Sequence, residues 1–180
     1  MSNFKSRLVG AIFACILFPT SAAAQFQIGG HVGFDFSASD LYIGPHAVFN
    51  LPVPVGSDDY LKLNPEFSYH LSDSNVPGVS YSFWLLGATA LYPLGFEFAS
   101  SYFGVGVILA RASTSIDVDP LFEDLLDEVG DSSTRLGLNL KVGAEFGESN
   151  VRPFGDVGYV ITSEDWLYVQ GGVRLGFGSE

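Results

Sequence analysis

The stretch Arg135–Phe146, RLGLNLKVGAEF, alternates polar and apolar residues without an exception. Its even-numbered positions hold Leu, Leu, Leu, Val, Ala and Phe, and its odd-numbered positions hold Arg, Gly, Asn, Lys, Gly and Glu. Successive side chains of a β-strand point to opposite faces, so this period of two predicts a strand with one apolar and one polar face.

The same pattern recurs along the chain, although the alternation is poorer in two of the segments. We expect eight strands, at 26–36, 41–51, 61–71, 81–92, 97–112, 135–146, 151–161 and 166–177. A tilted membrane-spanning strand needs about 9–11 residues, whereas strands of globular proteins average about 5–6. The lengths and the even strand number predict an all-β fold, an eight-stranded antiparallel up-and-down transmembrane β-barrel.

The N-terminal segment has the features of a secretion signal. Lys5 and Arg7 precede an apolar stretch at 8–18, and Ala22, Ala23 and Ala24 supply the small residues of a cleavage site. The apolar stretch is shorter than the about 20 residues that a membrane-spanning helix needs. We therefore expect a signal peptide at 1–24 and one barrel domain at 25–180, with a short N-terminal anchor helix as the alternative.

The charge balance excludes one class of partner. The chain has 8 Lys and Arg against 20 Asp and Glu, a net charge of −12. Phosphate backbones bind to basic faces, so a nucleic acid is not expected to be a partner. Charged residues make up only 16% of the chain, against about 25% in an ordinary soluble domain.

The few charges in the strands fall on the polar face and have mixed signs. An unpaired buried charge costs several kcal/mol, so a narrow lumen predicts pairing. We expect an interior polar network of Asp35, His46, Lys62, Glu66, His70, Arg135, Lys141, Glu145, Arg152, Asp156 and Arg174. An interior filled by side chains argues against an open pore.

Aromatic residues lie mostly near the strand ends, at Tyr60, Tyr69, Tyr81, Trp84, Tyr92, Tyr102, Tyr159 and Trp166. Such positions suit the aromatic girdles of membrane barrels. The ordinary preference of aromatic residues for strands is the alternative explanation.

The last strand carries a short motif made of Gln170, Gly172, Leu175 and Phe177. It resembles the C-terminal assembly signal that the insertion machinery of bacterial outer-membrane barrels reads, although Gly178, Ser179 and Glu180 follow the aromatic residue here. Over 25–177 the chain resembles the small outer-membrane proteins of the OmpA/OmpX type. The resemblance implies a place in the outer membrane of a Gram-negative bacterium, in contact with its lipids, its lipopolysaccharide and the insertion machinery.

This type includes structural barrels, adhesion proteins and a few lipid A-modifying enzymes, so the resemblance does not fix a function. His70 and Ser72 resemble the His-x-Ser element of lipid A deacylases, in which the histidine activates the serine. Asp73 stands where that motif has Asn, and the region of Trp84 lacks the expected acid. We favour a structural place for His70 in the interior network.

Three histidines, His31, His46 and His70, share the polar face of neighbouring strands. Imidazole is a common zinc ligand, but interior hydrogen bonding is the favoured interpretation. No cofactor is expected.

The connection 113–133 is long and acidic. Asp119 and Pro120 suit a helix start, and Gly130 suits its end, which predicts a short amphipathic helix over the extracellular mouth. A solvated acidic loop is the favoured interpretation. The alternatives are a surface for an extracellular protein partner and a cation site, with Asp119, Glu123, Asp124 and Asp127 as the carboxylates.

Taken together, these features predict an outer-membrane barrel with a structural or surface-interaction role and no catalysis. An acyl hydrolase acting on lipid A is the first alternative. A soluble periplasmic barrel with an apolar ligand inside is the second, because alternation alone does not say which face meets solvent.

Overall fold

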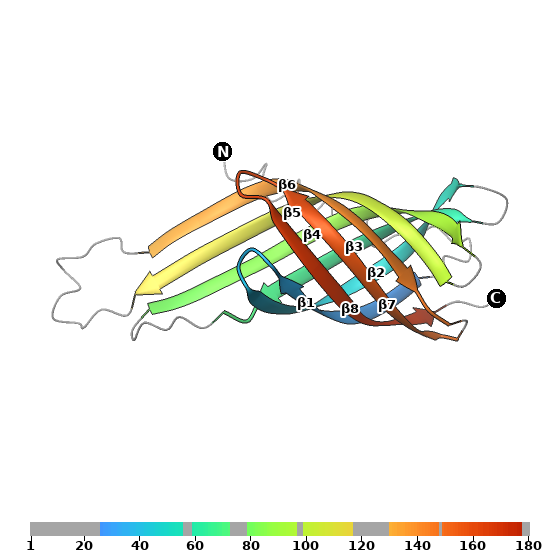
Figure 1. The fold of residues 1–180 in the computed structure, drawn as a ribbon, viewed down its shortest axis with the longest axis horizontal. Helices are drawn as coiled ribbons and strands as arrows, with labels where there is room; N and C mark the ends of the chain where they lie inside the picture. Colours follow the sequence, from blue (N-terminus) through green and yellow to red (C-terminus); the bar gives the residue numbers. More distant parts are fainter. Residues whose placement is uncertain are drawn as a thin grey trace, which may run out of the picture.

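The computed structural model describes residues 26–55, 59–72, 79–96, 99–116, 130–147 and 149–177. Each strand pairs antiparallel with its chain neighbours, and β1 pairs with β8 to close the barrel (Figure 1). The strands are β1 Phe26–Asp35, β2 Asp40–Pro54, β3 Tyr60–His70, β4 Val79–Phe96, β5 Ala99–Ile116, β6 Gly130–Glu145, β7 Val151–Ile161 and β8 Trp166–Phe177. The predicted all-β, eight-stranded up-and-down barrel is confirmed, whereas the predicted signal peptide lies outside the described residues.

The alternation of β6 determines what faces the lumen and what faces outward. Lys141 and Glu145 are each 2% exposed inside the barrel, whereas Leu138 and Val142 are each 52% exposed on its outer wall. The same division holds on β1, where His31 is buried and Val32 is exposed. The barrel is therefore apolar outside and largely polar inside, the reverse of a soluble carrier.

Four strands are longer than predicted from the sequence. β4 and β5 each have 18 residues, β6 has 16 and β2 has 15. Residues 93–96 belong to β4, and residues 113–116 and 130–133 belong to strands rather than to a loop. The Ser/Thr-rich ends pair with one another, as Ser113 does with Ser132, and such residues tolerate a strand without forming an apolar face.

Gly130, expected to follow the predicted helix, is the first residue of β6. The remainder of the predicted helix, at 119–129, lies outside the described residues.

Two lumen tyrosines lie over glycines of the adjacent strand. Tyr42 of β2 pairs with Gly33 of β1, and Tyr168 of β8 pairs with Gly158 of β7. A Cβ at either glycine would overlap the tyrosine ring. The missing side chain lets each ring lie flat against the wall, where it covers the glycine backbone.

Two of the aromatic residues considered for the girdles are inside the barrel instead. Tyr102 is 5% exposed and Trp166 is 9% exposed, because both stand at inward positions of their strands. Tyr69, Tyr92 and Tyr159 are exposed at outward positions of their strands, whereas Tyr81 lines the mouth of the barrel on the inward side of β4.

Candidate functional site: the lumen and its mouth

The barrel has two ends, a base and a mouth. The base is the end at which Phe26 of β1 pairs with Phe177 of β8. The mouth is the opposite end, with the turns at 36–39 and 162–165.

The central layer of the lumen is an ion pair with its hydrogen-bond partners. Lys141 Nζ of β6 donates to Glu66 Oε2 of β3 over 2.8 Å and to Asn64 Oδ1 over 3.0 Å. Asn139 Nδ2 donates to Glu66 Oε1 over 3.4 Å. Tyr168 donates its hydroxyl to Asn139 Oδ1 over 3.0 Å, so the pair is held by neutral groups on both sides. Such satisfaction is what a buried charge pair requires.

A second layer surrounds Arg174 of β8, which is 1% exposed. Its guanidinium donates to a Glu145 carboxylate oxygen, to His46 Nε2 over 3.1 Å and to the Tyr102 hydroxyl over 3.3 Å. Tyr102 in turn donates to Asp156 Oδ2 over 3.0 Å. The side chains of these two layers meet across the lumen, as expected for an eight-stranded barrel whose interior is filled by side chains.

The three histidines do not gather at one point. His31 Nδ1 lies 3.3 Å from His46 Nδ1, and His31 Nε2 lies 2.9 Å from Ser68 Oγ. His70 contacts Asp40 at the mouth instead. Within the described part of the chain, no group of three or more His, Cys, Asp or Glu side chains is arranged to hold a metal ion. The acidic candidates at 119–127 lie outside that part.

Arg135 and Glu164 form an ion pair at the rim of the mouth. Arg135 Nη1 lies 2.6 Å from Glu164 Oε2, and their side chains are 41% and 75% exposed. Hydrogen bonding to Arg135 and its positive charge lower the pKa of the exposed Glu164 carboxyl. Arg135 therefore belongs to the rim and not to the buried layers.

Other predicted interior residues lie nearer the ends of the barrel. Arg152 Nη1 is 3.9 Å from Glu145 Oε2 toward the base. Lys62 is half-buried and stands opposite Asn50 of β2. At the mouth, Asp35 Oδ1 accepts hydrogen bonds from the backbone of Ser37 and Ala38, which fixes the tight turn after β1.

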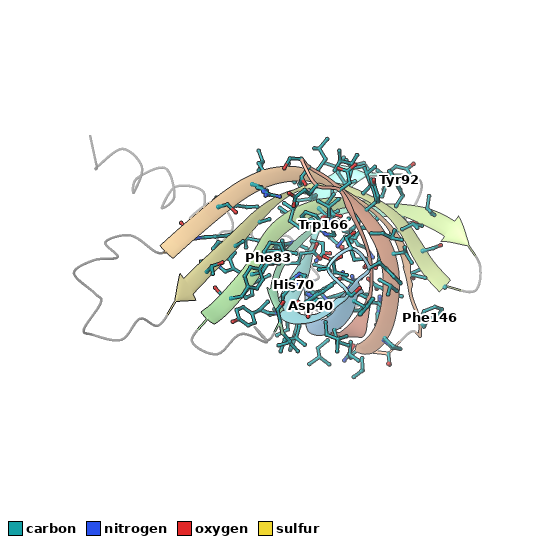
Figure 2. The ribbon with its side chains drawn as sticks, turned by 60° about the vertical axis from the view of Figure 1, so that its left-hand side comes forward. Asp40, His70, Phe83, Tyr92, Phe146 and Trp166 are labelled. Atoms are coloured by element: carbon teal, nitrogen blue, oxygen red, sulfur yellow. The ribbon has the colours of Figure 1, made fainter. Side chains whose placement is uncertain are left out.

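At the mouth, one carboxylate joins both candidate catalytic residues. Ser72 Oγ donates to Asp40 Oδ2, and His70 Nδ1 lies 3.5 Å from the same oxygen. Phe83 stands at the edge of the His70 ring, 4.5 Å between centroids. Figure 2 shows Asp40, His70, Phe83 and Trp166 together within the ring of strands, whereas Phe146 lies on its outside.

The motif of the last strand is divided between the two faces. Gln170 is buried and its Oε1 accepts from the Tyr42 hydroxyl over 3.1 Å. Gly172 lies against the backbone of β1. Leu175 and Phe177 face outward, where Phe177 stacks on Phe26 with 5.2 Å between centroids. The two aromatic rings thus cover the seam that closes the barrel at its base.

The interior network predicted from the sequence omits several residues that complete the lumen, namely Asp40, Tyr42, Asn64, Phe83, Tyr102, Asn139 and Trp166. Side chains separated by an even number of residues in a strand point to the same face. Tyr42 therefore faces inward with His46, and Asn139 faces inward with Lys141. Tyr102 was harder to find because the inner face of β5 continues with Gly104, Gly106, Ile108 and Ala110, which hides the alternation.

The comparisons with solved structures fit this geometry. The chain is similar to a major outer-membrane protein of Thermus thermophilus, with a TM-score of 0.63 and 16% identity over 87% of this chain and 100% of that one. The fold is that of the small outer-membrane barrels. No family model matches the chain, and neither does any curated protein.

Two further solved structures have the same architecture. Ail, the attachment invasion locus protein of Yersinia pestis, has a TM-score of 0.57 and 14% identity over 88% of this chain and 100% of Ail. The N-terminal β-barrel domain of Pseudomonas aeruginosa OprF has a TM-score of 0.57 and 13% identity over 87% of this chain and 100% of the domain. Among the residues described here, no helix is long and apolar enough to cross a membrane.

Proposed function

We propose that the chain is an outer-membrane β-barrel of a Gram-negative bacterium with a structural or surface-interaction role and no catalysis. One observation carries this proposal: the outer wall is an exposed apolar belt, whereas charged side chains are buried and paired inside. Leu138, Val142 and Val157 are between 45% and 52% exposed, a state that water disfavours and lipid does not.

The orientation follows from the ends of the chain. The N-terminal strand begins at the base beside Phe177, so the base faces the periplasm if the chain enters from that side. The mouth and the acidic connection between β5 and β6 then face the exterior. The wall contacts membrane lipid and lipopolysaccharide, and the insertion machinery reads the last strand through Leu175 and Phe177.

An extracellular partner is part of this proposal. One structure of similar fold is Ail in complex with the heparin analogue sucrose octasulfate. The present chain carries a net charge of −12, which disfavours a sulfated polysaccharide and favours a protein with a basic surface. We place that contact at the exterior connection between β5 and β6.

The acyl-hydrolase alternative has one supporting observation, the joint contact of His70 and Ser72 with Asp40. Nucleophilic catalysis needs the serine hydroxyl to donate to the histidine, which acts as its base. Here the hydroxyl of Ser72 donates to the carboxylate instead. The geometry favours a structural cluster.

The deciding experiment compares the gel mobility of boiled and unboiled samples of the protein, both taken from the outer-membrane fraction. Closed membrane barrels commonly stay folded in detergent until they are heated, so the expected result is a heat-dependent shift. A protein recovered in the soluble fraction without detergent, with no shift, contradicts the proposal and supports the soluble carrier.

A further inference from the structure

The mouth of the barrel contains a cavity of about 290 Å³. It lies between strands from most of the barrel and the turn before β8, and its lining includes Asp35, Asp40, His70, Phe83, Glu164 and Trp166. This volume is at the lower end of the range for small-molecule sites, so the cavity suits a ligand of few heavy atoms.

Negatively charged side chains outnumber positively charged ones in the lining of the cavity. Its lining holds four carboxylates, those of Asp35, Asp40, Glu164 and Asp165, and one guanidinium, that of Arg135. Arg135 is paired with Glu164, which leaves three carboxylates without a cation within this lining. A cationic ligand balances these charges.

His70 supplies an independent observation. The residue is 3% exposed, and its Nε2 has no hydrogen-bond partner in the described structure. Nδ1 faces Asp40 Oδ2 at 3.5 Å, which assigns the proton to Nδ1 and leaves a lone pair on Nε2. A buried acceptor without a partner, in the lining of an acidic cavity, needs a donor from the ligand.

Aromatic rings supply the apolar part of the lining. Phe83 and Trp166 lie edge to face, 6.4 Å between centroids, and Phe83 also meets the edge of His70. Aromatic faces attract cations and cover alkyl groups. The lining thus combines hydrogen-bond acceptors with aromatic surface.

We propose that the mouth cavity binds a small primary alkylammonium ion. The ammonium group donates to His70 Nε2 and to a carboxylate oxygen, and the alkyl chain packs against Phe83 and Trp166. This site goes beyond the proposed surface role and does not depend on it, because binding is measured on the purified protein.

The probe is 1,5-diaminopentane, and its neutral control is 1,5-pentanediol, which has the same length. The chain has two tryptophans, Trp84 in the wall and Trp166 in the cavity, so a Trp84→Phe background isolates the cavity signal. The folded protein is titrated in a nonionic detergent at pH 7 and constant ionic strength. We expect a saturable change in Trp166 fluorescence with the diamine and none with the diol. Calorimetry of the wild-type protein makes the same comparison without a substitution.

Three variants test the assignment. Asp40→Asn removes the carboxylate charge and His70→Leu removes the acceptor nitrogen, and each substitution is expected to weaken binding about tenfold or more. Ala112→Leu fills the cavity without changing its charge and is expected to abolish binding. Asp59→Asn removes an exposed carboxylate outside the cavity and is the matched control, with unchanged affinity.

Gel mobility establishes that each variant is folded before it is titrated. The proposal is overturned if the diamine does not saturate, if the diol binds equally well, or if Ala112→Leu binds like the wild type. A loss of affinity in Asp59→Asn equal to that in Asp40→Asn also overturns it, because it indicates attraction by net charge alone.

Discussion

Lys141 and Glu66 are separated by 75 residues in the sequence and meet at the centre of the lumen, with Nζ 2.8 Å from Oε2. β6 and β3 are not neighbours in the barrel, so this contact spans its interior. The ion pair thus connects β3 and β6, two strands that no backbone hydrogen bonds join directly.

The first prediction concerns this pair. Lys141→Met leaves the Glu66 carboxylate buried without its cation, which is expected to lower the free energy of unfolding by about 3–5 kcal/mol. The measurement is urea unfolding in lipid vesicles, followed by tryptophan fluorescence. The double variant Lys141→Met/Glu66→Gln removes both charges and is expected to recover part of the loss.

The matched control is Arg135→Gln, which breaks an ion pair at the exposed rim. Its unfolding midpoint is expected to stay close to that of the wild type, because solvent screens exposed pairs. Equal losses in the two single variants contradict a supporting role for the central pair.

The second prediction concerns Gly158 and the ring that covers it. Gly158→Ala places a Cβ against Tyr168 and is expected to destabilise the barrel by about 1–3 kcal/mol through overpacking. Gly155→Ala on the same strand is the control, because the atom nearest to its Cβ is 3.8 Å away. Chemical unfolding of both variants makes the comparison, and an equal effect argues against a specific role for the Tyr168 contact.

The third prediction tests which face meets lipid. Val105 is 46% exposed on the outer wall, next to Gly104, which pairs with Lys141. Val105→Arg is expected to cost about 2–4 kcal/mol in a bilayer, because a lipid-facing charge is desolvated near the midplane. The folded fraction after refolding into vesicles measures the cost.

Ser132→Arg is the control for this substitution, since Ser132 is exposed on the part of β6 that extends beyond the barrel at the mouth. It is expected to refold like the wild type. If Val105→Arg refolds equally well, the outer wall meets water, and the soluble carrier becomes the better description.

The fourth prediction concerns catalysis. Cells with and without the protein are expected to have the same lipid A mass profile, because Ser72 donates to Asp40 and is not activated by His70. Mass spectrometry of extracted lipid A makes the comparison. A missing acyl chain that depends on the protein, and that returns in both His70→Ala and Ser72→Ala, supports the acyl hydrolase instead.

Period-two alternation predicts the barrel and most of its inward residues. It works on β6 because each inward position there is polar or glycine, so parity and polarity agree. It fails to delimit β4 and β5, where inward Leu85, Leu91 and Ile108 are as apolar as the outer wall. Strand ends rich in serine have no apolar face, so the alternation of polar and apolar residues gives no sign of a strand there.

The contacts of Asp40 with His70 and Ser72 at the mouth could not be predicted from the sequence, for a different reason. Asp40 and His70 come from strands whose relative stagger is fixed only by the ladder between them. Local patterns give the face of a side chain but not its height along the barrel axis. The partner of His70 therefore depends on register, which the closed sheet determines as a whole.

The unequal strand lengths also fix how deeply the barrel is immersed. The β6–β7 ladder ends at Leu138 and Ile161, and the β3–β4 ladder ends at Tyr69 and Trp84, whereas β5 continues with both of its neighbours. Beyond those two points the outer edges of β4 and β6 present backbone groups that hydrocarbon cannot satisfy. In the proposed orientation, the ends of these ladders mark the outer limit of the hydrocarbon layer, and the mouth ends of β4, β5 and β6 lie beyond it.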